Sequence, residues 1–365
     1  MLKYTHRKRS RYRFQDDKYT HRRQVTTVTI KDIARNTGVS VSSVSRVLNH
    51  HPDVSDDVRQ RVLDEVERSG YVPNNIARDL VRNHSDTIGV IVRGNENLFF
   101  SSVLKVIGSE IADHGYTMVL HYIDSDDDEV KAGAILERER KLLGLIFLGG
   151  RFDYSPEDVA GINIPYVLCT YNNCFGSLED GDFSSVTVDD HAIAYTATRE
   201  LTRRGHRRIA AVIPSRNDHS ISELRYNGFL DALRDSQLAC QPELVEETGG
   251  CFQMADAYNG VCRLLERTRD FTALLTLSDT SGMAAMKALS DAGLRIPEDV
   301  SVISIDGLDV SAYTVPTLST MVQPSADLGK ESVRILAKMI KNHDYTRHKL
   351  LEATLREGSS IRTLA

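Results

Sequence analysis

The chain has 365 residues, of which 41% are hydrophobic and 26% are charged, and its formal net charge is -6. These values are typical of folded globular proteins, and because one domain usually holds about 150 residues, we expect two or three domains. A membrane span would need about 18 consecutive apolar residues, and the sequence contains no such run. The N-terminal segment is basic and lacks the apolar core of a secretory signal, which predicts a cytoplasmic protein.

The charges are unevenly distributed along the chain. Up to His84 there are 17 basic and 10 acidic residues, whereas the remainder has 28 basic and 41 acidic residues. A basic head on an acidic body favours contact between the head and a polyanion, which charge alone does not identify as DNA, RNA or membrane. Residues 1–25 are expected to form a disordered basic arm. Weak phosphate contacts are the alternative, from Arg7, Lys8, Arg9, Arg11 and Arg13.

Residues 26–72 contain three short helical patterns. Thr29 is a suitable N-cap for a first helix that ends at Gly38, and Ser40 is a suitable N-cap for a second. Ser55 is expected to cap a third helix, which also ends at a glycine. Apolar residues recur at three- and four-residue spacing in each pattern, so the helices can share one small core. This arrangement predicts an all-α helix-turn-helix domain.

The second of these helices has two different faces. Val44 and Val47 lie on its apolar face, and the opposite face carries small polar residues and one arginine. Such a face fits the major groove of DNA, where hydroxyls and helix N-terminal amides hold phosphates while Val41, Ser42 and Arg46 reach base edges. A generic helical hairpin is the alternative interpretation.

The segment from Val28 to Val81 resembles the DNA-binding headpiece of the LacI/GalR repressor family. The resemblance is carried by VTIKDIARNTGVSVSSVSRVLN, VSDDVRQRV and GYVPNNIARDL. It implies base contacts from Val41, Ser42 and Arg46, and phosphate contacts from Thr29, Ser40, Ser43, Asn49 and Ser55.

Residues 73–84 include NNIARDLV, a helical pattern of about two turns that should not be stable alone in water. The resemblance implies a hinge helix that folds on DNA, pairs with its dimer mate and inserts Leu80 into the minor groove, with Ala77 also at the DNA. An ordinary linker helix that packs Ile76 and Leu80 against the body is the alternative.

From residue 85 to 365 short apolar runs alternate with amphipathic stretches, beginning with TIGVIV, TMVLHYI and GLIFLGG. The alternation predicts parallel sheets covered by helices on both faces, and about ten such runs favour two side-by-side α/β lobes over one sheet. Ligands of such sheets bind beyond the carboxyl ends of the strands, so the cleft between the lobes is the expected site. The expected bounds are about 85–189 plus 325–352 for the N-lobe and about 190–321 plus 353–365 for the C-lobe.

The side chains at the expected strand ends include aromatic, basic, acidic and amide groups, which suit a small polyhydroxylated or planar polar ligand. This body resembles the two-lobed, periplasmic-binding-protein-like effector core of the same family, through NLFFSSVLKVIGSEIADHGY, LRYNGF, AGLRIPEDVSVISIDG and LSTMVQP. The alternatives are that Phe99 and Phe100 only pack in the core and that Arg225 forms an ion pair at the surface. The resemblance implies effector contacts from Phe99, Phe100, His219, Arg225, Phe252, Asp306 and Gln323.

Two further effector positions depart from the pattern of the family. Thr170 stands where many relatives have Asp, and Ser278 stands where Asn is common. Both changes reduce the hydrogen bonding available to sugar hydroxyls, which disfavours a common hexose. A sugar or glycoside is the predicted effector class, with a nucleobase or nucleoside as the alternative.

The remaining local patterns are weak. The acidic run from Asp124 to Glu129 lacks the spacing of a calcium loop and is expected to favour the N-terminus of the next helix. The five cysteines lack metal or redox spacing and are interpreted as buried thiols. Catalytic and phosphate-binding motifs are also missing from the sequence, so no enzyme activity, cofactor or metal is expected.

Together these features predict a transcriptional repressor that binds a near-palindromic operator in double-stranded DNA as a homodimer and is released by its effector. A solute-binding protein and an α/β enzyme are the alternatives. The first predicts a signal peptide without a headpiece, and the second predicts turnover.

Overall fold

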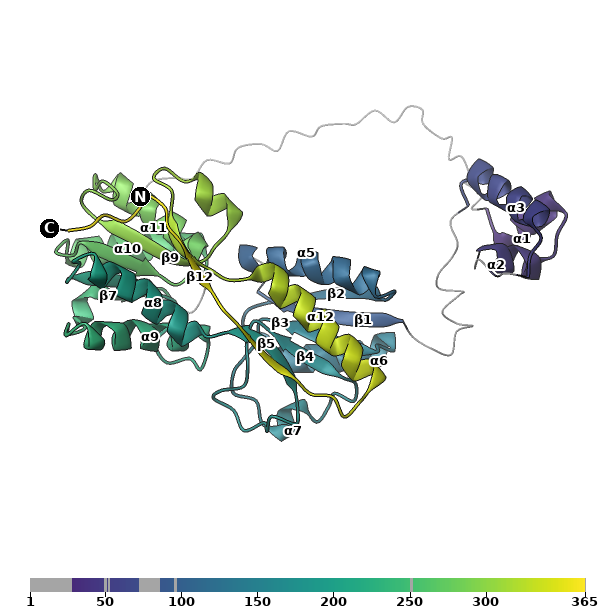
Figure 1. Ribbon diagram of the computed structural model, residues 1–365, viewed down its shortest axis with the longest axis horizontal. Helices are drawn as coiled ribbons and strands as arrows, with labels where there is room; N and C mark the ends of the chain where they lie inside the picture. Colours follow the sequence, from purple (N-terminus) through teal and green to yellow (C-terminus); the bar gives the residue numbers. More distant parts are fainter. Residues whose placement is uncertain are drawn as a thin grey trace, which may run out of the picture. The chain divides into compact units, whose positions relative to one another are not determined.

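The computed structural model describes residues 28–48, 51, 53–71, 86–94, 97–249 and 252–364. The chain divides into two compact units, Met1–Asn83 and His84–Ala365 (Figure 1). Asn49, Ala77 and Leu80 lie outside the described residues, as do the expected arm over 1–25 and the expected hinge helix over 73–84.

The described part of the first unit consists of three helices around one core: α1 (Ile30–Thr37), α2 (Val41–Leu48) and α3 (Asp56–Ser69). Asn36 donates a hydrogen bond of 2.7 Å to Glu65, which ties α1 to α3. These helices confirm the predicted helix-turn-helix. Their apolar spacing places one set of side chains in the common core: Ile33, Ala34, Val44, Val47 and Val62.

The predicted helix ends can be compared with the structure. Both the backbone N–H and the hydroxyl of Thr29 donate to the Asp32 carboxylate, at 3.0 and 2.7 Å. Ser40 accepts a hydrogen bond from the Ser43 backbone N–H at 3.1 Å and so caps α2. Ser55 occupies the N-cap position of α3, but its side chain accepts no cap hydrogen bond. Gly38 ends α1 with a φ of 69°, a conformation that glycine adopts without steric strain.

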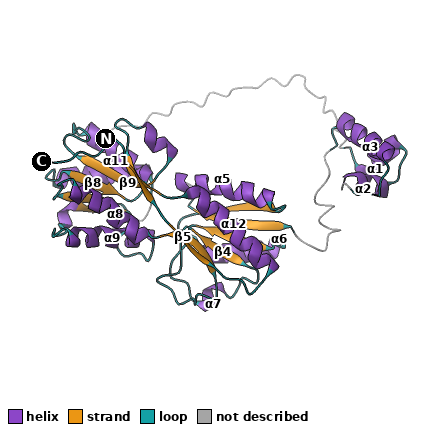
Figure 2. Ribbon diagram, in the orientation of Figure 1, coloured by secondary structure: helices purple, strands orange, loops and turns teal. Residues whose placement is uncertain are grey.

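The described residues of the second unit form two α/β lobes (Figure 2). The N-lobe sheet has six parallel strands in the order β11-β5-β4-β3-β1-β2. Its strands are β1 (Thr87–Arg93), β2 (Thr117–Ile123), β3 (Gly144–Leu148), β4 (Tyr166–Cys169), β5 (Ser184–Val188) and β11 (His348–Leu351). Its helices are α5 (Leu98–Asp113), α6 (Glu129–Arg140), α7 (Pro156–Val159) and α12 (Ser325–Lys341).

The C-lobe sheet has the strand order β12-β10-β9-β8-β6-β7, in which only β12 runs antiparallel to its neighbour among the described strands. Its strands are β6 (Ile209–Ile213), β7 (Val245–Glu247), β8 (Ala273–Thr276), β9 (Ser301–Asp306), β10 (Ser319–Val322) and β12 (Thr354–Arg356). Its helices are α8 (Asp190–Arg203), α9 (Ile221–Asp235), α10 (Met254–Arg267) and α11 (Asp279–Asp291), with short 3-10 turns η1 (Pro242–Leu244) and η2 (Asp309–Tyr313).

Each sheet is covered by helices on both faces, as the continuous apolar runs predicted. In the N-lobe, α5 and α12 pack on one face and α6 on the other. In the C-lobe, α8 and α9 pack on one face, and α10 and α11 on the other. The chain passes between the lobes before α8, before α12 and before β12. The connections between the lobes therefore lie at the carboxyl ends of the parallel strands, after β5, β10 and β11.

The interpretation of the cysteines as buried thiols is confirmed for Cys169 and wrong for Cys174, and Cys251 lies outside the described residues. Cys174 is exposed, because it lies in the loop after β4 and not on the inner face of a strand or helix. Cys169 is buried, whereas Cys240 and Cys262 are half-buried. Among the described helices, none combines the length and apolar character that crossing a membrane requires.

Candidate functional site

The outer face of α2 is the first candidate site. Val44 and Val47 point into the core, and Val41, Ser42 and Arg46 on the remaining turns are exposed. The helix therefore presents the three predicted base-contact residues on its solvent side. Only the face of α2 that carries Val44 and Val47 packs into the core, so Val41, Ser42 and Arg46 stay accessible to solvent.

The predicted phosphate-contact residues are in three different situations. The Ser40 hydroxyl lies 2.7 Å from the Ser42 hydroxyl and 2.8 Å from the Ser43 hydroxyl, so three serines form a polar cluster at the N-terminus of α2. The amides and hydroxyls of such a cluster can hold a phosphate oxygen. Ser55 is exposed. Thr29 instead donates both of its groups to Asp32, so in this structure it serves as a helix cap.

A cavity of about 750 Å³ between the two lobes of the second unit is the second candidate site. The residues of both lobes contribute to its wall. Arg225 is only 2% exposed, so the structure excludes the surface ion pair considered for it. Phe99 lines the cavity and also packs in the N-lobe core. All nine predicted effector positions line this cavity: Phe99, Phe100, Thr170, His219, Arg225, Phe252, Ser278, Asp306 and Gln323.

A buried charge cluster lies on the C-lobe side of the cavity. Arg225 of α9 donates through Nε to Asp190 at 2.9 Å and through Nη1 to the Leu277 carbonyl. The same Nη1 lies 3.9 Å from Asp306, which also accepts a 2.9 Å hydrogen bond from Gln323. One guanidinium thus faces the buried carboxyl groups of both Asp190 and Asp306. The cluster holds polar groups in fixed positions beside the cavity, as recognition of hydroxyl groups requires.

The two carboxylates of this cluster titrate abnormally. Burial raises the pKa of Asp306 to about 8 and that of Asp190 to about 6, while Arg225 lowers both. The ion pair of Asp190 is the shorter one, so Asp306 is the carboxyl that more readily takes up a proton. A protonated Asp306 can donate a hydrogen bond as well as accept one.

This raised pKa predicts a pH dependence of stability. Between about pH 5 and 7 the folded chain holds a proton on Asp306 that the unfolded chain has released, so the unfolding free energy falls with rising pH. One such group contributes up to about 1.4 kcal/mol per pH unit. We expect Asp306→Asn to reduce the slope of unfolding free energy against pH, measured by urea denaturation.

Asp299 provides the control for this measurement. Its hydrogen bonds with Arg295 lower its pKa, so its contribution changes only at acid pH. Asp299→Asn should therefore leave the slope between pH 5 and 7 unchanged. An unchanged slope in Asp306→Asn would mean that Asp306 is ionised throughout this range.

The two residues that depart from the family pattern occupy constrained positions. The Ser278 hydroxyl accepts a 3.1 Å hydrogen bond from the Ser281 backbone N–H and so caps α11. Thr170 has a φ of 76°, which is unfavourable for a β-branched residue and is maintained by the surrounding structure. Both side chains are almost fully buried at the cavity wall.

His219 connects the two lobes at the edge of the cavity. Its ring stacks on Phe175 of the N-lobe, with ring centroids 5.0 Å apart, and its Nδ1 lies 3.9 Å from the Asp153 carboxylate. Ile221 and Leu224 of α9 pack against the same N-lobe apolar cluster. The beginning of α9 therefore contacts the opposite lobe while it lines the cavity.

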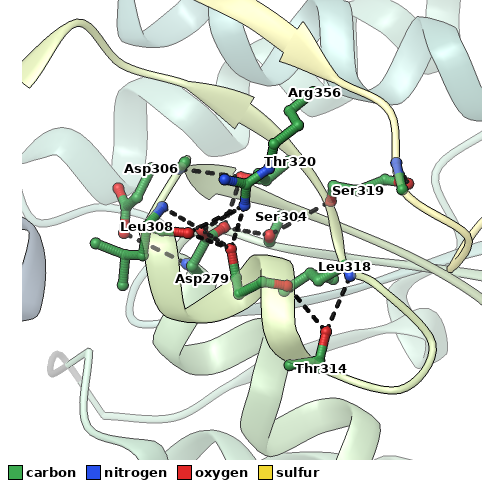
Figure 3. Close-up of polar contacts among 12 residues, drawn as sticks. Asp279, Ser304, Asp306, Leu308, Thr314, Leu318, Ser319, Thr320 and Arg356 are labelled. Carbon is green, nitrogen blue, oxygen red and sulfur yellow. Dashed lines mark hydrogen bonds and ion pairs between the residues drawn. The ribbon is translucent and has the colours of Figure 1, made fainter.

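Asp279 is the centre of a buried hydrogen-bond network behind the cavity (Figure 3). Its Oδ1 accepts hydrogen bonds from Ser304 of β9 and Thr320 of β10, both at 2.5 Å. Its Oδ2 accepts from the Leu308 backbone N–H and the Ser311 hydroxyl, both at 2.7 Å. The Asp279 N–H also donates to Asp306 at 3.3 Å. The carboxylate at the start of α11 thus connects β9, β10 and η2, behind the residues that line the cavity.

The sequence analysis missed several cavity residues at the N-lobe strand ends, among them the charged side chains and one serine that follow β1, β2 and β3: Arg93, Asp124, Ser125, Asp126 and Arg151. A signal was present, because each follows closely on a predicted strand. The acidic run was assigned only to the next helix, and Asp128 does cap α6 by accepting from Lys131. Across the described ranges, no group of three or more His, Cys, Asp or Glu side chains is arranged to hold a metal ion.

Comparison with known proteins agrees with this architecture. Residues 29–74 match the family model for bacterial regulatory proteins of the lacI family, and residues 198–361 match a periplasmic binding protein-like domain. The HTH-type transcriptional regulator MalR of Clostridium butyricum is 37% identical over 91% of this chain and 98% of its own length. The HTH-type transcriptional repressor PurR of Haemophilus influenzae (strain PittEE) is 30% identical over 87% of this chain and 92% of its own length.

A solved complex of the transcriptional regulator CelR with cellobiose is similar in fold. Its TM-score is 0.68 at 26% identity, over 91% of this chain and 99% of the other. A helix-turn-helix unit followed by a two-lobed α/β unit with an interlobe cavity defines the class of ligand-binding transcriptional regulators. The chain belongs to the lacI family of bacterial regulatory proteins.

Proposed function

We propose that the chain is a transcriptional repressor that binds a near-palindromic operator through α2 and is released when a small molecule occupies the interlobe cavity. The observation that carries the proposal is the exposed face of α2, in a unit separate from the one that contains the cavity. Val41, Ser42 and Arg46 are assigned to base edges, and the serine cluster at the start of α2 is assigned to the phosphates.

Arg46→Ala tests the assignment of base reading. Loss of a bidentate contact with a guanine should weaken binding to the selected operator by about 1 to 3 kcal/mol while binding to random DNA changes much less. Fluorescence anisotropy at fixed ionic strength with both DNAs measures the difference. The operator is first selected from genomic fragments in the presence of scrambled competitor.

Arg61→Ala is the matched control, because Arg61 is an exposed arginine of α3 that pairs with Asp57. It should leave the preference for operator over random DNA unchanged. An equal loss on both DNAs in Arg46→Ala would assign Arg46 to a phosphate. A wild-type chain without preference for any fragment would refute the repressor proposal itself.

A sugar or glycoside is the proposed effector class. Charged and amide groups held by one another, such as Arg225, Asp306 and Gln323, suit a ligand with many hydroxyls, and the nearby phenylalanines suit the apolar face of a sugar ring. The cellobiose in the CelR complex agrees with this class for a relative. A nucleobase or nucleoside is the alternative, and a thermal-shift comparison of sugars with nucleosides separates the two.

A homodimer is proposed as the working form. One helix of eight residues contacts few bases, so two copies on two half-sites are needed for specific binding. Tyr313, the last residue of η2, and Val315, just after it, are 85% and 97% exposed, and burial against a second copy would remove this apolar surface from water. We place the protein in the cytoplasm, on chromosomal DNA. Its relatives are regulators, and we propose that the cavity binds its ligand without turnover.

A further inference from the structure

The cavity extends along the N-lobe sheet beyond the positions that the family pattern implies. It follows the carboxyl ends of four adjacent strands: Thr170 after β4, Gly149 to Arg151 after β3, Arg93 and Gly94 at β1, and Asp124 to Asp126 after β2. Adjacent strands are about 4.8 Å apart, so three spacings make this wall about 14 Å long. A wall of this length exceeds a single sugar ring.

The far end of this wall is a polar site, which we call the outer subsite: Arg93, Asp124, Ser125, Asp126 and Arg151. Acidic residues contact both of its arginines. Glu129, which is fully buried, accepts a 2.7 Å hydrogen bond from the Arg151 backbone N–H and lies 3.7 Å from Nε of Arg93. Nε of Arg151 donates to Asp153 at 2.9 Å.

Two glycines without side chains, Gly149 and Gly150, line the cavity between its two ends. Gly149 has a φ of 75°, and a Cβ there would lie 2.6 Å from the Phe100 ring. A Cβ on Gly150 would lie 2.2 Å from Oε1 of Glu129. A larger residue at either position would displace groups that form the wall. Phe100 and Phe152 line the cavity together with these glycines. An aromatic ring suits the apolar face of a sugar.

The charge of the outer subsite selects the type of ligand. Arg151 already lies 3.7 Å from Asp128 and pairs with Asp153, and Asp124 and Asp126 add two more carboxylates to the wall. An anion such as a phosphate would be repelled by these carboxylates. Neutral hydroxyl groups, in contrast, can donate to the carboxylates and accept from the arginines.

We propose that the effector is a neutral oligosaccharide of at least two sugar rings, with one ring at Arg225, Asp306 and Gln323 and a second ring at the outer subsite. The inference rests on the proposed function, because it assigns the size and charge of the ligand of the same cavity. The carboxylates of the outer subsite then distinguish a disaccharide from its component monosaccharide.

Asp126→Ala in the full chain tests the inference. The Asp126 side chain is exposed at the cavity wall, so its loss should not affect folding. Isothermal titration with maltose, cellobiose and lactose, and with glucose and galactose, measures the affinities. At least one disaccharide should bind tenfold or more tightly than its component monosaccharides. Asp126→Ala should weaken that disaccharide about tenfold and leave the monosaccharides unchanged.

Asp113→Ala is the control, because Asp113 is exposed at the end of α5 and is not part of the cavity wall. It should bind every probe as the wild-type chain does. Monosaccharides that bind as tightly as every disaccharide would overturn the inference, as would an equal loss for both classes, or no loss, in Asp126→Ala.

A parallel measurement of operator affinity separates these outcomes from failure of the proposed function. A monosaccharide that releases operator leaves the sugar-responsive repressor intact and removes only the second ring. Release by a nucleoside alone would contradict the sugar class, and no release by any probe would contradict the proposed response. Either result also overturns the inference.

Discussion

Replacing Asp279 with alanine is expected to destabilise the second unit by at least about 3 kcal/mol, because it removes an acceptor from four buried donors and leaves two of them, the Leu308 N–H and the Thr320 hydroxyl, without any other acceptor. The affected donors are the hydroxyls of Ser304, Thr320 and Ser311 and the Leu308 backbone N–H. Water cannot replace the carboxylate easily, since the site is fully buried. Chemical denaturation of the full chain, followed by far-UV circular dichroism, measures the loss.

Asp291→Ala is the matched control at the other end of α11. Asp291 is exposed, pairs with Lys287 one turn away and accepts a 2.9 Å hydrogen bond from Tyr258 of α10, so its replacement should change stability by about 1 kcal/mol or less. A small loss in Asp279→Ala would show that the network can rearrange around a missing carboxylate. Asp279→Ala should also weaken ligand binding, because the Asp279 carboxylate anchors β9 and β10, whose ends carry Asp306 and Gln323 at the cavity wall.

Arg225→Ala is expected to have two large effects. The second unit should lose about 3 to 5 kcal/mol of stability near pH 8, because Asp190 and Asp306 would remain buried without their common cation. The loss should be smaller at pH 5, where the raised pKa values allow these carboxyls to be protonated. The variant should also no longer release operator when effector is added.

The double variant Arg225→Ala with Asp190→Asn separates the two effects. It removes the closer unpaired carboxylate, so it should regain part of the lost stability while the response to effector stays absent. Operator affinity without effector should equal that of the wild-type chain, because the first unit is unchanged. Recovery of the response together with stability would show that Arg225 acts only on folding.

The two proposed binding events must influence each other equally. If effector weakens operator binding by some factor, then operator weakens effector binding by the same factor. The cavity has walls from both lobes, and His219 together with Leu308 already connects them. A ligand with contacts on both lobes would therefore change how firmly they hold together.

The bounds of strands and helices show how much of the secondary structure local sequence predicts. Strands β1, β2 and β3 coincide closely with the predicted apolar runs, and β1 and β3 are buried in the middle of the N-lobe sheet, whereas β2 is its edge strand and is largely exposed. From the sequence pattern, three helices of the second unit are expected to begin near Ser101, Ala192 and Ser281, but α5, α8 and α11 begin two or three residues earlier. Their N-caps explain the difference, since the side chains of Asn97, Asp189 and Ser278 accept backbone hydrogen bonds at these starts.

The sequence by itself determined the two-unit organisation, the helix-turn-helix and the alternation of strands and helices, because capping residues, apolar spacing and continuous apolar runs are local properties. It also indicated the nine effector positions by resemblance to a family. Only the tertiary structure decided that Arg225 lies between two buried carboxylates and that Asp279 holds β9 and β10. Only the strand order placed the end of β2 at the same wall as β4. Such contacts join residues that are far apart in the chain. The pKa values of the carboxyl groups involved depend on their burial, which a local sequence pattern does not predict.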